Sequence, residues 1–455
     1  MNKSNRTSIV SIVTIASIVT IASMVTIVSP ASAQPVPWTL RQCTEYAVSH
    51  NLQVKQQDNQ RLKNELSLST ARNSRLPDLS ASVSENFSFG RGLTAENTYT
   101  NTNTNSTSFS LGTSVPLFTG FQIPNTIQLN RLNLEAATQD LERIKNDVRT
   151  QVAQAYVQSL YNMEIRDVAL RQIVIDSMQV HRLQAMLDNG RASTVELSQQ
   201  QATLANSRLT ATQADNQLRL SLLTLTQLLE LPTPEGFTIA RPELDGLVCG
   251  DIIATNPDLI YTEALTTRPE VAAEQLRLQG TEHSIKIAQA GLYPTLSLSA
   301  GLGTNYYKTS GFQADGFGRQ LKNNFSQFIG LNLQIPIFNR FSTRNNIRAA
   351  RLDQENQQLQ LDYVKKNLYK EIQQAYYNAV AANEKWKSSR QARQAAEDAF
   401  NLMQAKYENG KANLTEFNEA KNNFLKAESD LVQAQYELIY QTTLLDFYRG
   451  RELSF

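Results

Sequence analysis

Residues 79–89 read Leu-Ser-Ala-Ser-Val-Ser-Glu-Asn-Phe-Ser-Phe. The odd positions are mostly apolar, whereas every even position is Ser or Asn. An alternation with a period of two predicts a β-strand with one apolar face and one polar face. The same pattern returns in residues 108–115, where Phe109, Leu111 and Val115 share a face. The Thr- and Asn-rich residues 94–107 between the two strands are expected to form an exposed loop.

This strand pair occurs twice in the chain. Residues 115–118 (Val-Pro-Leu-Phe) recur as residues 335–338 (Ile-Pro-Ile-Phe), at a separation of 220. Residues 76–80 (Leu-Pro-Asp-Leu-Ser) recur as residues 293–297 (Tyr-Pro-Thr-Leu-Ser), at a separation of 217. The sequence therefore predicts two tandem copies of one unit. The second copy has strands at about 295–304 and 325–335, with an exposed loop at 305–324, and the three-residue difference falls in the loop between the strands.

Helical periodicity follows each strand pair. Leu361, Val364, Leu368 and Ile372 are spaced about 3.6 residues apart, which predicts a helix. In the first copy this helix is expected from about residue 125 to residue 188, where Asn189 and Gly190 provide a helix stop. Its length, roughly 95 Å at about 1.5 Å per residue, exceeds that of an ordinary globular domain.

The returning helix, expected at 193–230 in the first copy, has a seven-residue repeat in which large and small residues alternate. This pattern predicts close-packed helices with a left-handed supercoil. The helical stretch at 38–76 and the returning helix together match the long helix in length. We therefore expect these two shorter helices to lie end to end beside it. In the second copy the large residues are Phe417, Phe424, Leu431, Leu438 and Leu445, and the small ones include Ala420, Ala427 and Ala434.

The N-terminus has the pattern of a secretory signal peptide. Lys3 and Arg6 precede residues 9–28, which contain only Ile, Val, Ala, Met, Ser and Thr, and residues 31–33 are Ala-Ser-Ala. Cleavage is expected after Ala33, and a retained membrane anchor is the alternative. The remaining sequence contains no apolar run of about 18 residues, so any further membrane crossing would have to use β-strands.

The number of strands then restricts the assembly. Each strand has about ten residues, the length of a tilted transmembrane strand. Four strands are too few to close a barrel, and open sheet edges are not tolerated in lipid. Several chains must therefore close one barrel together, either two chains with eight strands or three with twelve. Only the larger barrel begins to leave a water-filled lumen, which the Ser and Asn face would line.

The order of these elements resembles that of the TolC-like outer-membrane efflux proteins. The resemblance includes residues 38–47, 115–118 and 407–411 and covers essentially the whole mature chain. It implies a mainly α fold with a β-barrel contribution, in which a homotrimer forms a 12-stranded outer-membrane barrel and a periplasmic α-helical tunnel. The corresponding layout is a signal peptide (1–33), a first repeat (34–231), a connector (232–260), a second repeat (261–448) and a tail (449–455).

The resemblance also implies a function. Such a protein would be the passive exit duct of a tripartite efflux pump or a type I secretion system for drugs, small molecules or proteins. Its partners would be a periplasmic adaptor, an inner-membrane transporter and outer-membrane lipid. The alternative is a secreted or periplasmic coiled-coil scaffold without a pore.

In this family the turn end of the helices is the gate and faces the adaptor. By position after the turn, Glu416 and Glu419 correspond to acidic gate residues, and the first repeat has Glu196 but Gln199. The family usually has Asp at these positions, and ordinary solvated charges are the alternative interpretation. The expected turn and adaptor-contact residues are Gly190, Arg191, Gly410 and Lys411.

No pattern indicates an enzyme, a cofactor or a metal site. The three histidines, His50, His181 and His283, lie far apart, without the spacing of zinc ligands. Cys43 and Cys249 are the two cysteines, and an oxidising compartment would allow them to form one disulfide. The net charge of +1 gives no reason to expect nucleic acid.

Overall fold

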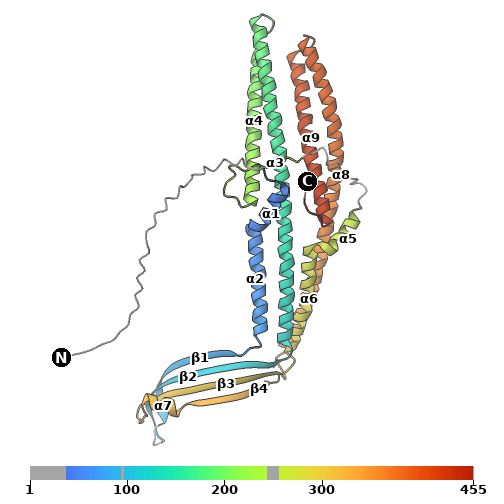
Figure 1. Ribbon diagram of the computed structural model, residues 1–455. Helices are drawn as coiled ribbons and strands as arrows, with labels where there is room; N and C mark the ends of the chain where they lie inside the picture. The colour runs from blue at the N-terminus through green and yellow to red at the C-terminus, as the bar shows by residue number, and fades with distance from the viewer. Residues whose placement is uncertain (1–36, 94–96, 243–255, 454–455) are drawn as a thin grey trace, which may run out of the picture. The chain divides into compact units, whose positions relative to one another are not determined.

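The two halves of the chain fold into the same series of elements, to which the second half adds one short helix, α7 (Phe317–Asn323; Figure 1). Gln122 and Ser342 begin helices of 67 residues each, at a separation of 220. Leu52 and Pro269 begin helices of 22 residues each, at a separation of 217. Both predicted separations, and with them the tandem repeat, are confirmed. The first half contains α1 (Leu40–His50), α2 (Leu52–Asn73), β1 (Asp78–Leu93), β2 (Tyr99–Thr119), α3 (Gln122–Asp188) and α4 (Thr194–Leu228). The second contains α5 (Pro257–Thr267), α6 (Pro269–Ala290), β3 (Thr295–Thr309), α7 (Phe317–Asn323), β4 (Ser326–Gln334), α8 (Ser342–Glu408) and α9 (Leu414–Tyr448).

The computed structural model describes residues 37–93, 97–242 and 256–453. The expected signal peptide at 1–33 lies outside these residues, and so does Cys249, the expected disulfide partner. Cys43 lies inside them and is fully buried, which raises the pKa of its thiol to about 12. Among the described residues, none of the helices contains a stretch long and apolar enough to cross a membrane.

The four strands form one antiparallel sheet in the order β1-β2-β3-β4. Leu111 pairs with Leu302 and Ala300 pairs with Ile329, so the apolar positions of neighbouring strands share a face. Ser82 pairs with Ser110 on the opposite face, where their hydroxyl oxygens lie 2.7 Å apart. The predicted alternation therefore continues across both strand pairs, and the two copies meet where β2 pairs with β3.

Three of the strands are longer than predicted. The prediction of a loop at 94–107 is wrong from Tyr99 onward, because β2 begins at Tyr99 instead of near residue 108. β1 reaches Leu93 and β3 reaches Thr309, and the second loop contains the short helix α7. Thr favours strands, and the ladder Leu93↔Tyr99 to Glu85↔Thr107 satisfies the backbone of this polar segment.

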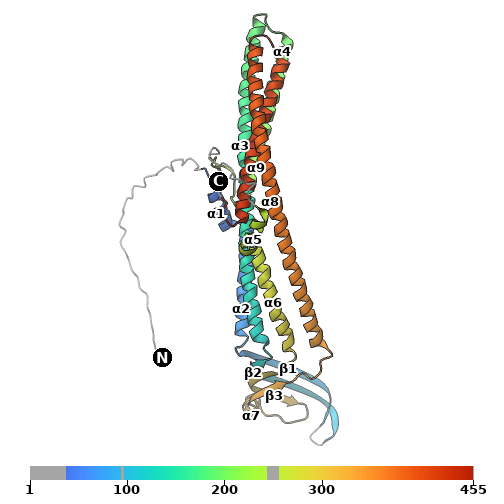
Figure 2. The same ribbon diagram turned by 90° about the vertical axis from the view of Figure 1, so that its right-hand side faces the viewer.

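Helix α3 is the centre of the first repeat. α4 packs along the half of α3 that leads to the turn, while α2 and α6 pack along the half nearer the sheet (Figures 1 and 2). The Asn51 side chain donates to the carbonyl of Leu228 (3.2 Å), so α2 begins where α4 ends. The expected end-to-end arrangement of the two shorter helices is therefore confirmed.

Each helical stretch that precedes the strands is broken into two helices. A single helical stretch was expected at 38–76. Instead, α1 ends at His50 and α2 begins at Leu52, because the Asn51 side chain caps α2 by accepting a hydrogen bond from the Gln53 N–H (2.9 Å). In the second repeat the break falls at Arg268, before Pro269. The second repeat was expected from residue 261, but α5 begins at Pro257, where Asn256 caps the helix.

Candidate functional site

The helical hairpins α3–α4 and α8–α9 end in turns of the same geometry. Gly190 and Gly410 have φ values of 68° and 70°, the left-handed conformation that glycine adopts without strain. The Gly190 N–H donates to the carbonyl of Leu187 (2.9 Å), and the next N–H, of Arg191, donates to the carbonyl of Met186 (2.8 Å). These two bonds define a Schellman motif, so the predicted glycine stops have a direct backbone cause.

The returning helices begin with matched caps. Ser193 and Asn413 each accept a hydrogen bond from the N–H of the glutamate three residues later, and that glutamate accepts from the cap N–H in return. These glutamates are Glu196 and Glu416, two of the three expected gate residues. Hydrogen bonds from the Ser193 N–H and hydroxyl hold the pKa of Glu196 below its ordinary value. Both side chains therefore stabilise helix starts, whatever else they do.

A groove of about 710 Å³ lies between the two turns. It brings together five of the seven expected site residues, whereas Gly190 and the exposed Glu419 lie outside its lining. The groove of one chain is balanced in charge and is therefore not acidic by itself. Its basic residues are Arg182, Arg191 and Lys411, its acidic residues are Glu196, Glu408 and Glu416, and Gly410 and Tyr407 also line it.

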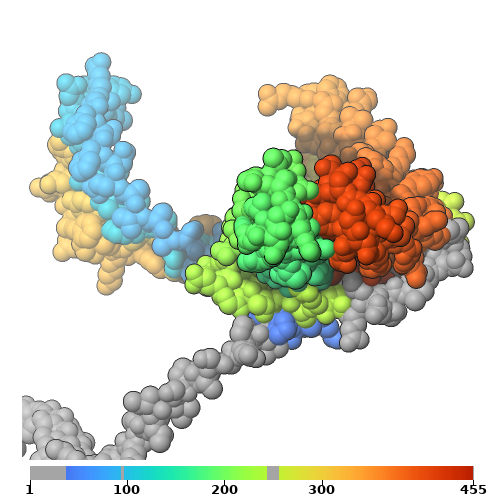
Figure 3. All heavy atoms as spheres, turned by 90° about the horizontal axis from the view of Figure 1, so that it is seen from above, coloured from blue at the N-terminus to red at the C-terminus, as the bar shows by residue number. Residues whose placement is uncertain are grey.

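Apolar contacts hold the two hairpin tips against each other. Leu183 and Leu197 of the first hairpin and Leu414 and Phe417 of the second form one buried cluster. Viewed onto the tips, Figure 3 shows the green first hairpin directly against the red second hairpin. Arg182 crosses between them, because its guanidinium lies 3.8 Å from the Glu408 carboxylate and 5.6 Å from the centre of the Tyr407 ring.

A buried ion pair joins the hairpins farther from the turns. The Lys421 ammonium of α9 lies 2.5 Å from the Asp176 carboxylate of α3, and these residues are 1% and 0% exposed. Asp176 also accepts hydrogen bonds from Gln172 (2.7 Å), Ser207 (2.5 Å) and Gln200 (3.3 Å). A buried carboxylate requires such donors to offset its lost hydration.

The sequence analysis missed this pair but contained a signal for it. Gln200 and Ser207 occupy small-residue positions of the heptad in α4, and their counterparts in α9 are Ala420 and Ala427. Polar side chains at otherwise apolar core positions predict a buried polar partner. The partner itself could not be predicted, because Asp176 and Lys421 are 245 residues apart.

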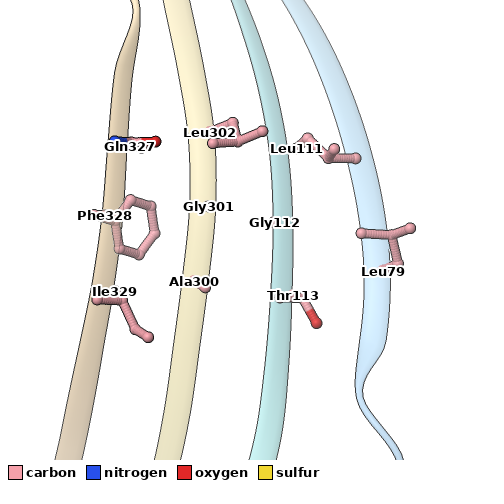
Figure 4. Close-up of a pocket in the computed structure, with 10 residues that line it drawn as sticks. All are labelled: Leu79, Leu111, Gly112, Thr113, Ala300, Gly301, Leu302, Gln327, Phe328 and Ile329. Carbon is pink, nitrogen blue, oxygen red and sulfur yellow. The ribbon is translucent and has the colours of Figure 1, made fainter.

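The sheet carries an exposed apolar face. Leu79 and Ile329 are 74% and 76% exposed, and both line a shallow cavity of about 560 Å³. Figure 4 shows Leu79, Leu111, Leu302 and Ile329 on successive strands around this cavity. The Phe328 ring instead lies over Gly301, where an added Cβ would meet it at 2.6 Å. Phe328 therefore covers the other, Ser- and Gly-rich face.

These features occur together in a known family. The model of the family described as outer membrane efflux protein matches residues 46–230 and 260–450, which include both repeats and both turns. The chain belongs to this outer membrane efflux protein family. The family predicted from the order of the elements is thus confirmed, and the membership places this efflux protein in the outer membrane.

Three curated relatives of this efflux protein are 22% to 26% identical to it over the matched residues. Outer membrane efflux protein BepC of Brucella suis is 22% identical over 336 residues, which cover 74% of this chain and 70% of BepC. Pyoverdine export outer membrane protein OpmQ of Pseudomonas aeruginosa is 26% identical over 48% of this chain and 42% of OpmQ. Toluene efflux pump outer membrane protein TtgC of Pseudomonas putida is 25% identical over 55% of this chain and 48% of TtgC. The chain thus spans less than half the length of OpmQ and TtgC.

Solved structures share the fold of this efflux protein. The CmeC outer membrane channel of Campylobacter jejuni superposes with a TM-score of 0.76 at 18% identity, covering 91% of this chain and 87% of CmeC. The outer-membrane channel OprN superposes with a TM-score of 0.73 at 20% identity, covering 90% and 89%. The family and these neighbours are channels rather than enzymes.

In the described part of the chain, no group of three or more His, Cys, Asp or Glu residues could hold a metal ion.

Proposed function

We propose that three copies of this efflux protein form one exit duct. Their sheets close a 12-stranded barrel in the outer membrane, and their helical hairpins form a periplasmic tunnel. An inner-membrane transporter and a periplasmic adaptor supply the cargo and the energy, so the duct itself is passive and catalyses no reaction. The cargo class is small molecules or proteins that the transporter selects.

The observation that carries this proposal is the sheet with two open edges. Within the described residues β1 and β4 each pair on one side only, and the face beside them exposes a band of large apolar side chains. An unpaired strand edge at the depth of the lipid acyl chains would leave backbone groups without hydrogen bonds, whereas pairing β1 of one copy with β4 of the next satisfies them. The band includes Leu79, Val83, Phe87, Phe89, Ile329, Leu331 and Leu333.

Aromatic side chains at the junction of sheet and helices support a membrane boundary there. The rings of Phe118 and Phe121 are 5.3 Å apart, and those of Phe338 and Phe341, the corresponding pair, are 5.5 Å apart. Phe121, Phe338 and Phe341 are all exposed. Exposed rings at the end of an apolar band are typical of the interface of a membrane barrel.

The groove between the turns is the proposed adaptor-facing end and gate. Three-fold assembly would place three copies of its charged side chains, together with Glu419, around one axis. Arg191 and Lys411 carry no ion pair among the described residues and are exposed, so they are available to carboxylates of an adaptor. Glu416 and Glu419 are the proposed cation-selecting acids of this gate.

Purified protein in detergent tests the proposal. Light scattering should give the mass of three chains, and the same sample should conduct ions in planar lipid bilayers. A cysteine pair, one on β1 and one on β4, should form a disulfide only between chains. A monodisperse single chain that stays soluble without detergent and gives no conductance would instead support the scaffold.

A further inference from the structure

The two repeats close the junction between their shorter helices in different ways. In the first repeat, the Leu52 N–H at the start of α2 donates to the Glu230 carboxylate (3.2 Å). Asn51 caps the same helix, since its side-chain oxygen accepts from the Gln53 N–H. The first repeat therefore provides its own carboxylate at this helix N-terminus, where an anion is favoured.

In the second repeat that carboxylate is absent. Gly450 occupies the position of Glu230, and Arg268 occupies the position of Asn51. Arg268 provides no side-chain cap to α6, and Pro269 has no N–H to donate. The exchange removes a negative group and adds a positive one at the same place in the fold.

Arg268 is buried without a hydrogen-bonding anion. The residue is 7% exposed, and its guanidinium lies 4.6 Å from the ring centres of both Phe447 and Tyr448. Within the described residues its Nε has no hydrogen-bond partner, and the nearest carboxylate oxygen, of Glu270, is 4.0 Å away. At longer range, the charge of Arg268 interacts with the carboxylates of Asp147 and Glu371.

A cavity of about 610 Å³ adjoins this guanidinium. Four arginines line it, and two of them already have carboxylate partners, since Arg41 pairs with Glu45 (2.8 Å) and Arg451 with Asp446 (3.0 Å). Arg149 bonds only to the Asn146 side chain in the described part of the chain. The remaining acidic residue in the lining is Glu452, and Gly450 leaves open the space that a side chain would fill.

We propose that this cavity binds a small oxyanion, a phosphate or carboxylate group, between Arg268 and Arg149. The anion takes the place that the Glu230 carboxylate fills in the first repeat. A buried guanidinium nitrogen without an acceptor, such as the Arg268 Nε, is unfavourable, and the planar fork of arginine matches the oxygens of carboxylate and phosphate. The rings of Phe447 and Tyr448 position the Arg268 guanidinium before the anion binds.

Calorimetric titration of the detergent-solubilised full-length protein tests the site. Inorganic phosphate and acetate are titrated separately, with chloride at the same ionic strength as the reference. We expect saturable binding of one anion per chain. The anion that binds more tightly shows whether the site prefers a phosphate or a carboxylate group. Arg268→Met keeps an apolar stem beside the rings but removes the charge, and should weaken binding at least tenfold. Arg219→Met, at an exposed arginine of α4, should leave it unchanged.

A second variant tests the site by filling it. Gly450→Glu restores the carboxylate of the first repeat. A Cβ at Gly450 would meet nothing within 4 Å, and its positive φ is a conformation that Glu230 also adopts. This variant should lose the anion titration while it assembles normally. The proposal is overturned if wild type shows no saturable heat with either anion up to ~10 mM, or if Gly450→Glu and Arg268→Met bind as wild type does.

Discussion

The two helical hairpins have the same lengths and turns but different interiors. Around its buried carboxylate, the α3–α4 hairpin has Gln172, Asp176, Gln200 and Ser207, and all four counterparts in α8–α9 are alanine. The second hairpin fills its interior with rings instead, and those of Phe400 and Phe424 stack 5.6 Å apart. Near the turn, four rings of the second hairpin replace aliphatic residues of the first, with Phe400, Tyr407, Phe417 and Phe424 at the positions of Val180, Leu187, Leu197 and Leu204.

The helix lengths of a hairpin therefore do not depend on which residues fill its interior. The caps and Schellman turns are alike in both hairpins and determine the helix lengths. The interior can then combine medium aliphatic with polar residues, or large rings with alanine, because either combination fills the same volume. Lys421 breaks this independence, since it extends from the second hairpin into the polar interior of the first, where Asn418 also donates to Gln200 (3.3 Å).

The largest expected effect comes from breaking that cross-connection. Lys421→Met leaves Asp176 buried with no cation and should destabilise the helical hairpins by about 3–5 kcal/mol. Denaturant unfolding followed by helical circular dichroism measures the loss, and limited proteolysis near the turns should become faster. The exposed Lys387→Met in α8 is the control.

A multiple variant sharpens this test. Gln172→Ala, Asp176→Ala, Gln200→Ala and Ser207→Ala together with Lys421→Met give the first hairpin the alanines of the second. Removing both charges avoids an unpaired ion, so this variant should lose less stability than Lys421→Met alone, despite the cavities that it creates. If the single change costs under 1 kcal/mol, the ion pair does not join the hairpins.

The second prediction compares the strand-to-helix junctions. Gly120 and its counterpart Arg340 both have positive φ, but a Cβ at Gly120 would lie 2.7 Å from the Ala290 carbonyl oxygen and 2.9 Å from the Tyr293 Cβ. Gly120→Ala should therefore cost about 1–3 kcal/mol. Arg340→Gly relieves a left-handed side chain and should be neutral within about 1 kcal/mol. The yield of assembled protein and its thermal midpoint measure both, and equal losses would contradict the comparison.

The third prediction concerns the caps, which the two hairpins share. Ser193→Ala removes hydrogen bonds to Glu196 and should destabilise α4 by about 1 kcal/mol at neutral pH. Because the Glu196 pKa is lowered in the folded protein, its contribution is present above the ordinary carboxyl pKa and is lost as pH falls through the folded value. The difference between wild type and variant should thus shrink under acid conditions. A gap that stays constant with pH would exclude Glu196 as its source.

Much of this architecture could be predicted from local patterns. The strand faces, the two repeat separations and both glycine turns follow from periodicity and from glycine chemistry. The length of β2 could not be predicted, because a run of Thr and Asn is typical of loops until a neighbouring strand pairs with it. The capping role of Glu196 and Glu416 was predictable from the spacing of Ser193 and Asn413, three residues upstream.

The smallest expected effect tests that gate. Glu416→Gln with Glu419→Gln should weaken pore block by multivalent cations about threefold, since exposed charges are strongly screened. Glutamine also fits the third position of a capping box, so the change removes charge while it keeps the α9 cap. Single-channel recording at low salt gives the block constant.

The matched controls separate charge at the gate from charge elsewhere. Glu65→Gln, on the exposed face of α2, should leave the block constant unchanged. Lys411→Gln removes a positive charge from the same groove and should strengthen the block, because the remaining acids then face less opposing charge. If the double change at Glu416 and Glu419 leaves the block constant unchanged, as Glu65→Gln does, neither acid contributes to cation selection. The matching caps of the two hairpins would then be purely structural.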